Sequence, residues 1–235
     1  MTELPHGVDI KRHGAILKSI LADIYKDNEL AAQLVFKGGT CLMLFYGLDR
    51  FSTDLDFDIR AGASEVNQKK LDDIIKKYIK IDRKESRKKR FGYTWAGSYE
   101  KGMQKVKIDI NHRGRLGRFE VKNFMGLSVP TMTVPDMFAN KLAAILERKK
   151  FQNRDLYDAY FMFMKMWSPN PALLKARTGL SEKKYYKKLA EFLENDEAQR
   201  NILFGLGAVL SSKQKAWVKN HLVDSLRTQL LIRID

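Results

Sequence analysis

The chain has 235 residues, of which 44% are hydrophobic and 30% charged, and this composition is typical of a globular protein and excludes a disordered or fibrous chain. Its only cysteine, Cys41, excludes an intrachain disulfide and favours a reducing compartment. The charged first twenty residues lack the apolar core of a signal peptide, and no apolar stretch is long enough to span a bilayer. We therefore expect a cytoplasmic protein with no membrane association.

The net charge of +15 is concentrated in the middle of the chain. Residues 1–75 carry 9 basic and 12 acidic side chains, residues 76–118 carry 15 and 4, and residues 119–235 carry 19 and 12. Positive charge concentrated in this way produces an electrostatic field that attracts polyanions, among which nucleic acid is a common partner. The densest run predicts phosphate contacts to RNA, with a merely solvated loop as the alternative, and its cations are Arg83, Lys84, Arg87, Lys88, Lys89 and Arg90.

Apolar spacing predicts an N-terminal α/β domain over residues 1–132. A short strand or helix end at residues 34–36 leads through a glycine turn into a buried helix at residues 41–47. The remaining predicted elements are helices at residues 9–25 and 64–80 and strands at residues 54–59, 91–98, 103–110 and 119–129.

A proline and capping pattern at residues 133–136 marks a boundary, and residues 133–235 are predicted to form a helical domain. Helical periodicity indicates helices at residues 136–149, 153–167, 181–194 and 211–233.

Three acids alternate with apolar residues on the strand predicted at residues 54–59. Residues two apart on a strand share a face about 6.6 Å apart, which places Asp54, Asp56 and Asp58 in one row. Carboxylates are the preferred ligands of hard divalent ions such as magnesium, so the row indicates either a metal site or an acidic edge strand.

Two further patterns accompany the acids. Gly38 and Gly39 allow backbone amides to approach a phosphate, and Thr40 and the following helix N-terminus add donors. Asp109, between two isoleucines on a later strand, can complete a set of three carboxylates.

This order of motifs resembles the nucleotidyltransferase fold of the polymerase-beta type. The strings at residues 37–40, 46–47 and 50–57, with two later motifs at residues 141–148 and 154–158, resemble one branch in particular, the AbiEii toxin family of toxin–antitoxin and phage-defence systems. The resemblance spans residues 30 to 165. It implies an α/β catalytic domain with a helical C-terminal domain, a nucleoside triphosphate substrate, and Mg²⁺ bound by Asp54, Asp56 and Asp109.

The resemblance also gives roles to residues that are weak candidates alone. Arg50 and Ser52 become candidates for phosphate binding and active-site support. Lys141 and Arg148 lie on one helical face, where cations suit a triphosphate held between the two domains. Asp155 and Asp158 share a face at a spacing of three and are expected either to orient those cations or, for Asp155, to cap a helix.

The sequence thus predicts a Mg²⁺-dependent nucleotidyltransferase toxin. The resemblance implies the 3′ end of tRNA as acceptor, a block of translation, and a cognate antitoxin as partner. The alternatives are nucleotidylation of a small molecule or a protein, or a non-catalytic RNA-binding protein. No chemistry is assigned to the histidines or to Cys41.

Overall fold

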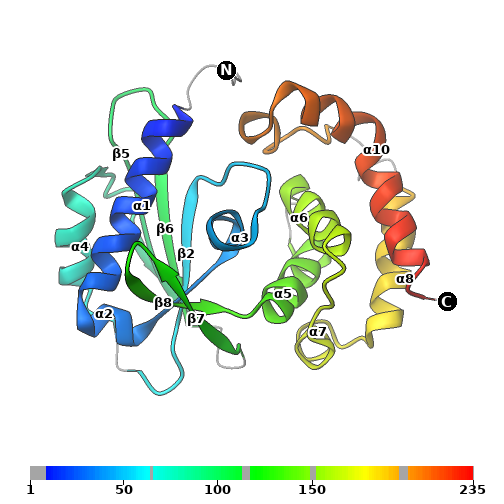
Figure 1. Cartoon of the computed structure of the whole chain (residues 1–235), viewed down its shortest axis with the longest axis horizontal. Helices are drawn as coiled ribbons and strands as arrows, with labels where there is room; N and C mark the ends of the chain where they lie inside the picture. The colour runs from blue at the N-terminus through cyan, green and yellow to red at the C-terminus, as the bar shows by residue number, and fades with distance from the viewer. Residues whose placement is uncertain (1–8, 64–65, 113–116, 149–151, 196–200, 235) are drawn as a thin grey trace. The chain divides into compact units, whose positions relative to one another are not determined.

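The computed structural model describes residues 9–63, 66–112, 117–148, 152–195 and 201–234. The chain divides into two units, His6–Thr133 and Val134–Asp235, which are described separately (Figure 1).

One mixed sheet forms the centre of the first unit. Its described strands follow the order β3-β5-β6-β2-β1-β8-β7, and β4 pairs with β5. The β2–β6 and β1–β8 pairs are parallel, and the other pairs are antiparallel. The bounds are β1 Leu34–Lys37, β2 Asp54–Ile59, β3 Lys80–Ile81, β4 Arg87–Lys89, β5 Gly92–Ser98, β6 Val106–Asn111, β7 Phe119–Phe124 and β8 Leu127–Met132.

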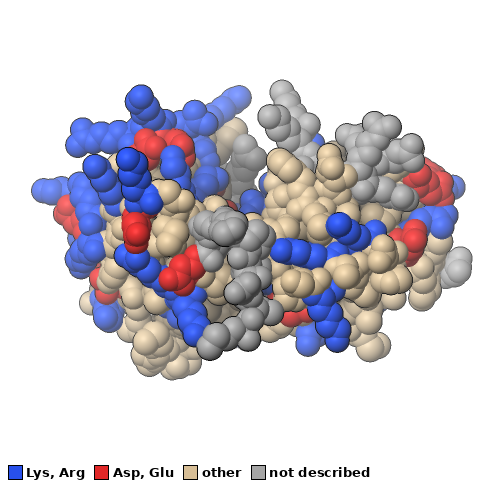
Figure 2. Space-filling model, turned by 90° about the horizontal axis from the view of Figure 1, so that it is seen from above, with Lys and Arg blue, Asp and Glu red and all other residues tan. Residues whose placement is uncertain are grey.

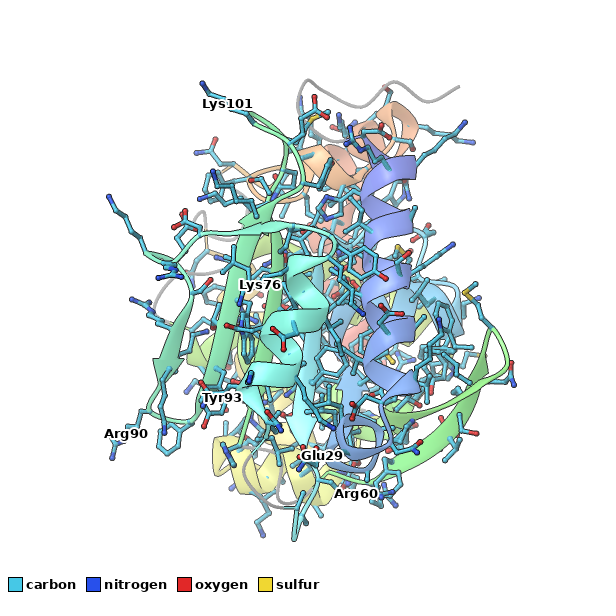
Figure 3. All side chains as sticks on the ribbon, turned by 90° about the vertical axis from the view of Figure 1, so that its left-hand side faces the viewer. Glu29, Arg60, Lys76, Arg90, Tyr93 and Lys101 are labelled. Carbon is cyan, nitrogen blue, oxygen red and sulfur yellow. The ribbon has the colours of Figure 1, made fainter. Side chains whose placement is uncertain are left out.

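Helices α1 (Ile10–Lys26) and α4 (Gln68–Lys76) cover one face of this sheet (Figures 1 and 3). Helix α1 begins at Asp9, whose carboxylate accepts a hydrogen bond from the backbone amide of Arg12, and it buries an apolar stripe. Helices α2 (Asn28–Gln33) and α3 (Gly38–Tyr46) flank β1 in the sequence.

Strand alternation separates the core from the opposite face. Phe57 of β2 lies 6.3 Å from the ring of Tyr25 of α1, and the indole of Trp95 of β5 donates to Asp72 of α4 at 2.5 Å. Ile108 and Ile110 of β6 are fully buried. Because side chains alternate along a strand, the polar residues between these positions lie on the face that α1 and α4 leave uncovered.

The second unit is helical. Buried aromatic side chains form part of its core, and the hydroxyl of Tyr185 donates to the carbonyl of Leu142. Asn170 caps α7 and also donates to the carboxylate of Asp136 at 2.6 Å. Its described helices are α5 Val134–Glu147, α6 Asn153–Met164, α7 Pro171–Thr178, α8 Glu182–Leu193, the 3₁₀ helix η1 Gly207–Val209 and α10 Ser212–Leu231.

The predicted fold class, a mixed sheet flanked by helices and followed by helices, is confirmed. Several element bounds were wrong. The strand predicted at residues 119–129 is the hairpin β7–β8, because Met125 and Gly126 adopt positive φ angles of 53° and 83° and reverse the chain. The helix predicted at residues 64–80 is the shorter α4, and residues 64–65 lie outside the described ranges.

Five described elements were missed altogether, namely α2, β3, β4, α7 and the 3₁₀ helix η1. Helix α7 has only eight residues, too few to show periodicity, and the short strand β4 lies inside the run of cations. Of the described helices, none is long and apolar enough to cross a membrane.

Candidate active site

One row of residues crosses five adjacent strands on the uncovered face. The strand registers pair Arg87 with Thr94, Thr94 with Asp109, Asp109 with Asp56, and Asp56 with Lys37. This long-range pairing brings together the carboxylates on β2 and β6 that lie more than fifty residues apart in the sequence. Asp54 belongs to the neighbouring row, where it pairs with Lys107 of β6.

The two glycines closely approach candidate site residues, and Gly38 lies directly against this row. Gly38 has a φ angle of 83°, and a Cβ atom added to it would lie 2.5 Å from Oδ2 of Asp56. A Cβ atom on Gly39 would lie 2.8 Å from Oγ of Ser52 and 2.9 Å from the guanidinium of Arg50. Only residues without side chains allow the backbone to approach these groups so closely. The structure therefore brings both glycines, Arg50, Ser52 and Asp56 together.

The predicted glycine turn is the first turn of α3. Its cap residue, Lys37, makes no side-chain capping hydrogen bond. The hydroxyl of Thr40 is buried and donates to the backbone carbonyl of Asp54, so in this structure it supports β2. The ammonium of Lys37 lies 2.5 Å from the carboxylate of Asp58, which is buried.

Asp109 lies between two lysines. Its Oδ1 atom is 2.7 Å from Nζ of Lys89, its Oδ2 atom is 2.5 Å from Nζ of Lys107, and it also accepts a hydrogen bond from Thr94. Burial raises the pKa of Asp109, but the hydrogen bonds from Lys107, Lys89 and Thr94 outweigh it and lower the pKa below its ordinary value of 3.8. Asp109 is therefore charged at neutral pH.

Lys107 experiences the field of all three acids. Burial lowers its pKa, but the hydrogen bond with Asp109 and the charges of Asp109, Asp54 and Asp56 raise the pKa above its ordinary value of 10.5. The three acids therefore favour the positively charged form of Lys107.

The donor chemistry of the three acids fits a hard divalent ion, because the set consists of carboxylate oxygens on neighbouring strands. Within the described ranges, however, no three His, Cys, Asp or Glu side chains are arranged as a metal site. Binding of a shared ion requires Lys107 and Lys89 to release the carboxylate of Asp109.

The later motif forms a separate ion cluster inside the helical unit. Nζ of Lys141 on α5 is 3.2 Å from Oδ1 of Asp155 and 2.7 Å from Oδ2 of Asp158, both on α6. Nε of Arg148 is 3.1 Å from Oδ2 of Asp155. The cap residue of α6 is Gln152, so Asp155 does not act as its cap, and both acids are buried. The two acids hold the two cations within this unit.

The six cations of the basic run occupy three different surroundings. Lys84, Arg87 and Lys89 line an open pocket, whereas Arg83 lines another surface pocket near α4. Lys88 and Arg90 lie over the rings of Tyr93 and Phe91 at 5.6 Å and 5.1 Å. Figure 3 shows Arg90 pointing away from the sheet. Figure 2 shows Lys and Arg side chains crowding the surface of the first unit.

Sequence reasoning missed the partners of the acids. Lys107 and Thr94 were not candidates, although Lys107 stands two residues before Asp109 on the same strand and alternation alone could have indicated their shared face. His13 was also given no role, yet its Nε2 atom lies 3.0 Å from the carbonyl oxygen of Thr53, next to the first acid. No sequence signal connects α1 to this position.

Two solved structures share the fold of this chain. JHP933 from Helicobacter pylori has a similar fold, with 20% identity, 99% of this chain and 94% of that chain covered, and a TM-score of 0.62. A second Helicobacter pylori structure, whose description proposes a nucleotidyltransferase, has 20% identity over 94% of this chain and 93% of that chain, with a TM-score of 0.60. These likenesses support the nucleotidyltransferase-like fold predicted from the motifs.

The family match is more specific. The family described as nucleotidyl transferase AbiEii toxin, type IV toxin–antitoxin system, matches residues 19–217. The chain therefore belongs to the AbiEii family and is a toxin nucleotidyltransferase, as the motifs predicted. No curated protein sequence matches the chain.

Proposed function

We propose that this enzyme transfers a nucleoside monophosphate from a nucleoside triphosphate to the 3′ end of an RNA, with tRNA as the expected acceptor, and thereby blocks translation. The observation that carries the proposal is the row in which Asp56 and Asp109 lie side by side, with Gly38 packed against Asp56 and Gly39 packed against Arg50 and Ser52. The net charge of +15 supports a polyanionic acceptor.

In this proposal the glycine turn and Arg50 bind the triphosphate, and Ser52 supports the turn. Asp54 and Asp56 hold Mg²⁺, and Asp109 completes the set. When bound, the ion neutralises charge that develops on the phosphoryl oxygens.

At the α-phosphorus, the transfer step forms one bond and breaks one. The 3′ hydroxyl oxygen of the acceptor attacks the α-phosphorus, and the bond from that phosphorus to the β-phosphate oxygen breaks. Pyrophosphate leaves, and the carboxylate of Asp109 accepts the hydroxyl proton. The carboxylate of Asp109 is ionised at neutral pH, and it can take the proton once Lys89 and Lys107 have released it.

We also propose that Lys141 and Arg148 contribute positive charge to the nucleotide, and that Asp155 and Asp158 orient them. The distances of 2.7 and 3.2 Å from Lys141 to the two acids support this orienting role. Membership of a toxin–antitoxin family implies that a cognate antitoxin counteracts the activity.

The test incubates the enzyme with Mg²⁺, one labelled nucleoside triphosphate at a time, and total tRNA. Label should appear on RNA and require both the metal and Asp56. The Asp56→Asn variant should lose transfer, whereas Asp73→Asn should keep it, because Asp73 is an exposed residue of α4. Label on protein or on a small molecule instead of RNA would replace the proposed acceptor. Unchanged transfer by Asp56→Asn would contradict the proposed site.

A further inference from the structure

An open pocket of about 280 Å³ lies on the uncovered face of the sheet, on the β5 side of Asp109. Four cations line it, and the only acid among the lining residues is Glu85. The pocket also contains the buried hydroxyl-bearing side chain of Thr94, which pairs across the sheet with Asp109. Its cations are Lys84, Arg87, Lys89 and Lys107.

The register of β4 explains why only part of the basic run reaches this pocket. Arg87 pairs with Thr94, so its side chain is on the same face as Asp109, and alternation gives Lys89 the same direction. Lys88 pairs with Tyr93 and lies on the other face of the strand.

Two of the four cations are available to a ligand. Lys89 and Lys107 both form ion pairs with Asp109. Among the described residues, neither Lys84 nor Arg87 pairs with a carboxylate, and both are exposed. A guanidinium beside ammonium groups suits a phosphate, because the planar guanidinium donates two parallel hydrogen bonds to its oxygens.

The position of the pocket distinguishes the acceptor from the donor nucleotide. The glycine turn approaches Asp56 and follows β1, whereas the pocket lies beyond β6, over β5 and β4. Asp109 therefore lies between the glycine turn and the pocket. A phosphate group in the pocket would lie beside the residue that receives the acceptor proton.

We propose that this pocket binds a backbone phosphate of the RNA acceptor and thereby positions the terminal hydroxyl at Asp109. The inference rests on the proposed function and specifies which cations contact the acceptor. Lys84 and Arg87 bind the phosphate, and Lys89 and Lys107 connect the pocket to the carboxylate of Asp109.

The experiment compares two double variants that remove the same charge from the same segment. Lys84→Gln with Arg87→Gln empties the pocket of its two unpaired cations, and Lys88→Gln with Arg90→Gln serves as the matched control. Binding of a labelled single-stranded RNA oligonucleotide is measured by fluorescence anisotropy over a range of salt concentrations. A parallel titration measures binding of ATP, and thermal melting confirms that both variants are folded.

We expect the pocket variant to bind RNA about tenfold more weakly at low salt. The slope of log affinity against log salt should decrease by about 0.7, since the pocket neutralises one phosphate and each neutralised phosphate of a single strand contributes about 0.7. The control should lose clearly less on both measures, and neither variant should change ATP binding.

Equal losses of RNA affinity in the two double variants would overturn the proposed role of the pocket, since they would show a general effect of charge. Loss of ATP binding instead of RNA binding would assign the pocket to the donor triphosphate. The outcome is separable from that of the proposed function. Transfer of label to RNA with unchanged binding by the pocket variant refutes the pocket alone. Pocket-dependent RNA binding without transfer refutes the proposed function alone.

Discussion

Replacement of Lys141 by methionine should destabilise the helical unit strongly. The side chain of Lys141 is 16% exposed, and those of its partners Asp155 and Asp158 are 2% and 0% exposed. With an effective dielectric constant of 20, the pairs at 3.2 and 2.7 Å have gross attractions of about 5 and 6 kcal/mol. The desolvation cost of the two carboxylates remains when the lysine is removed, so we expect a loss of about 3–5 kcal/mol in the free energy of unfolding.

The assay is urea unfolding followed by circular dichroism. The single variant is compared with the double variant Lys141→Met with Asp158→Asn, which removes one charge of each sign. Its stability should recover part of the loss, with a coupling energy of about 1–3 kcal/mol in the double-mutant cycle. A Lys141→Met protein within about 0.5 kcal/mol of the parent, which is the usual effect of a surface substitution, would refute the buried ion cluster. If the variant remains folded, its turnover should fall by about 10² to 10³, and RNA binding should barely change.

Three further predictions concern the first unit. Gly38→Ala should lower the free energy of unfolding by about 1–2 kcal/mol and reduce nucleotide transfer, because its φ angle is 83° and the new methyl group would meet Asp56 at 2.5 Å. Chemical unfolding measures the first effect and label transfer the second. Parental values in both assays would contradict the close approach of Gly38 to Asp56. Burial lowers the pKa of His13 below 6.5, so the imidazole of the unfolded state takes up a proton first, and the stability of the protein should decrease as the pH falls below 6.5. In urea unfolding, the stability of the His13→Gln variant should decrease less over this pH range. Identical pH profiles of the two proteins would contradict the buried neutral imidazole. Asp54→Asn should abolish transfer and leave the melting temperature unchanged, and parental transfer rates would indicate a merely exposed acidic edge.

The sequence allowed prediction of the fold class and the family because both depend on local signals. Alternation around Asp56, the glycine pair at Gly38 and the later motif around Lys141 are all visible within a few residues. Strand pairing is not local, since it depends on which segments meet in the folded sheet. The contact of Lys89 with Asp109 and the division of the basic run were therefore beyond sequence reasoning.

The helical unit shows the same limit. The spacing of Asp155 and Asp158 predicted a shared face, but whether that face meets Lys141, a metal or solvent depends on the packing of α5 against α6. The hairpin β7–β8 was missed for a local reason, because Met125 is an uncommon residue at a positive φ angle and Gly126 alone is a weak turn signal.

Along β2 and β6, side chains alternate between the apolar core and the face that carries the acids, so a single inserted residue affects both folding and the candidate site. Even-numbered positions of β2 carry the acids and odd-numbered positions carry the core, as in Asp56 and Phe57. A shift of the pairing by one residue would exchange the two sets, so that carboxylates would enter the apolar layer beneath α1 and α4. An insertion or deletion of one residue within either strand should therefore remove fold and activity together, whereas under the proposed function Asp-to-Asn substitutions on the open face should give an inert protein with an intact core. Such a protein would offer a non-toxic form for isolating the proposed acceptor and the antitoxin.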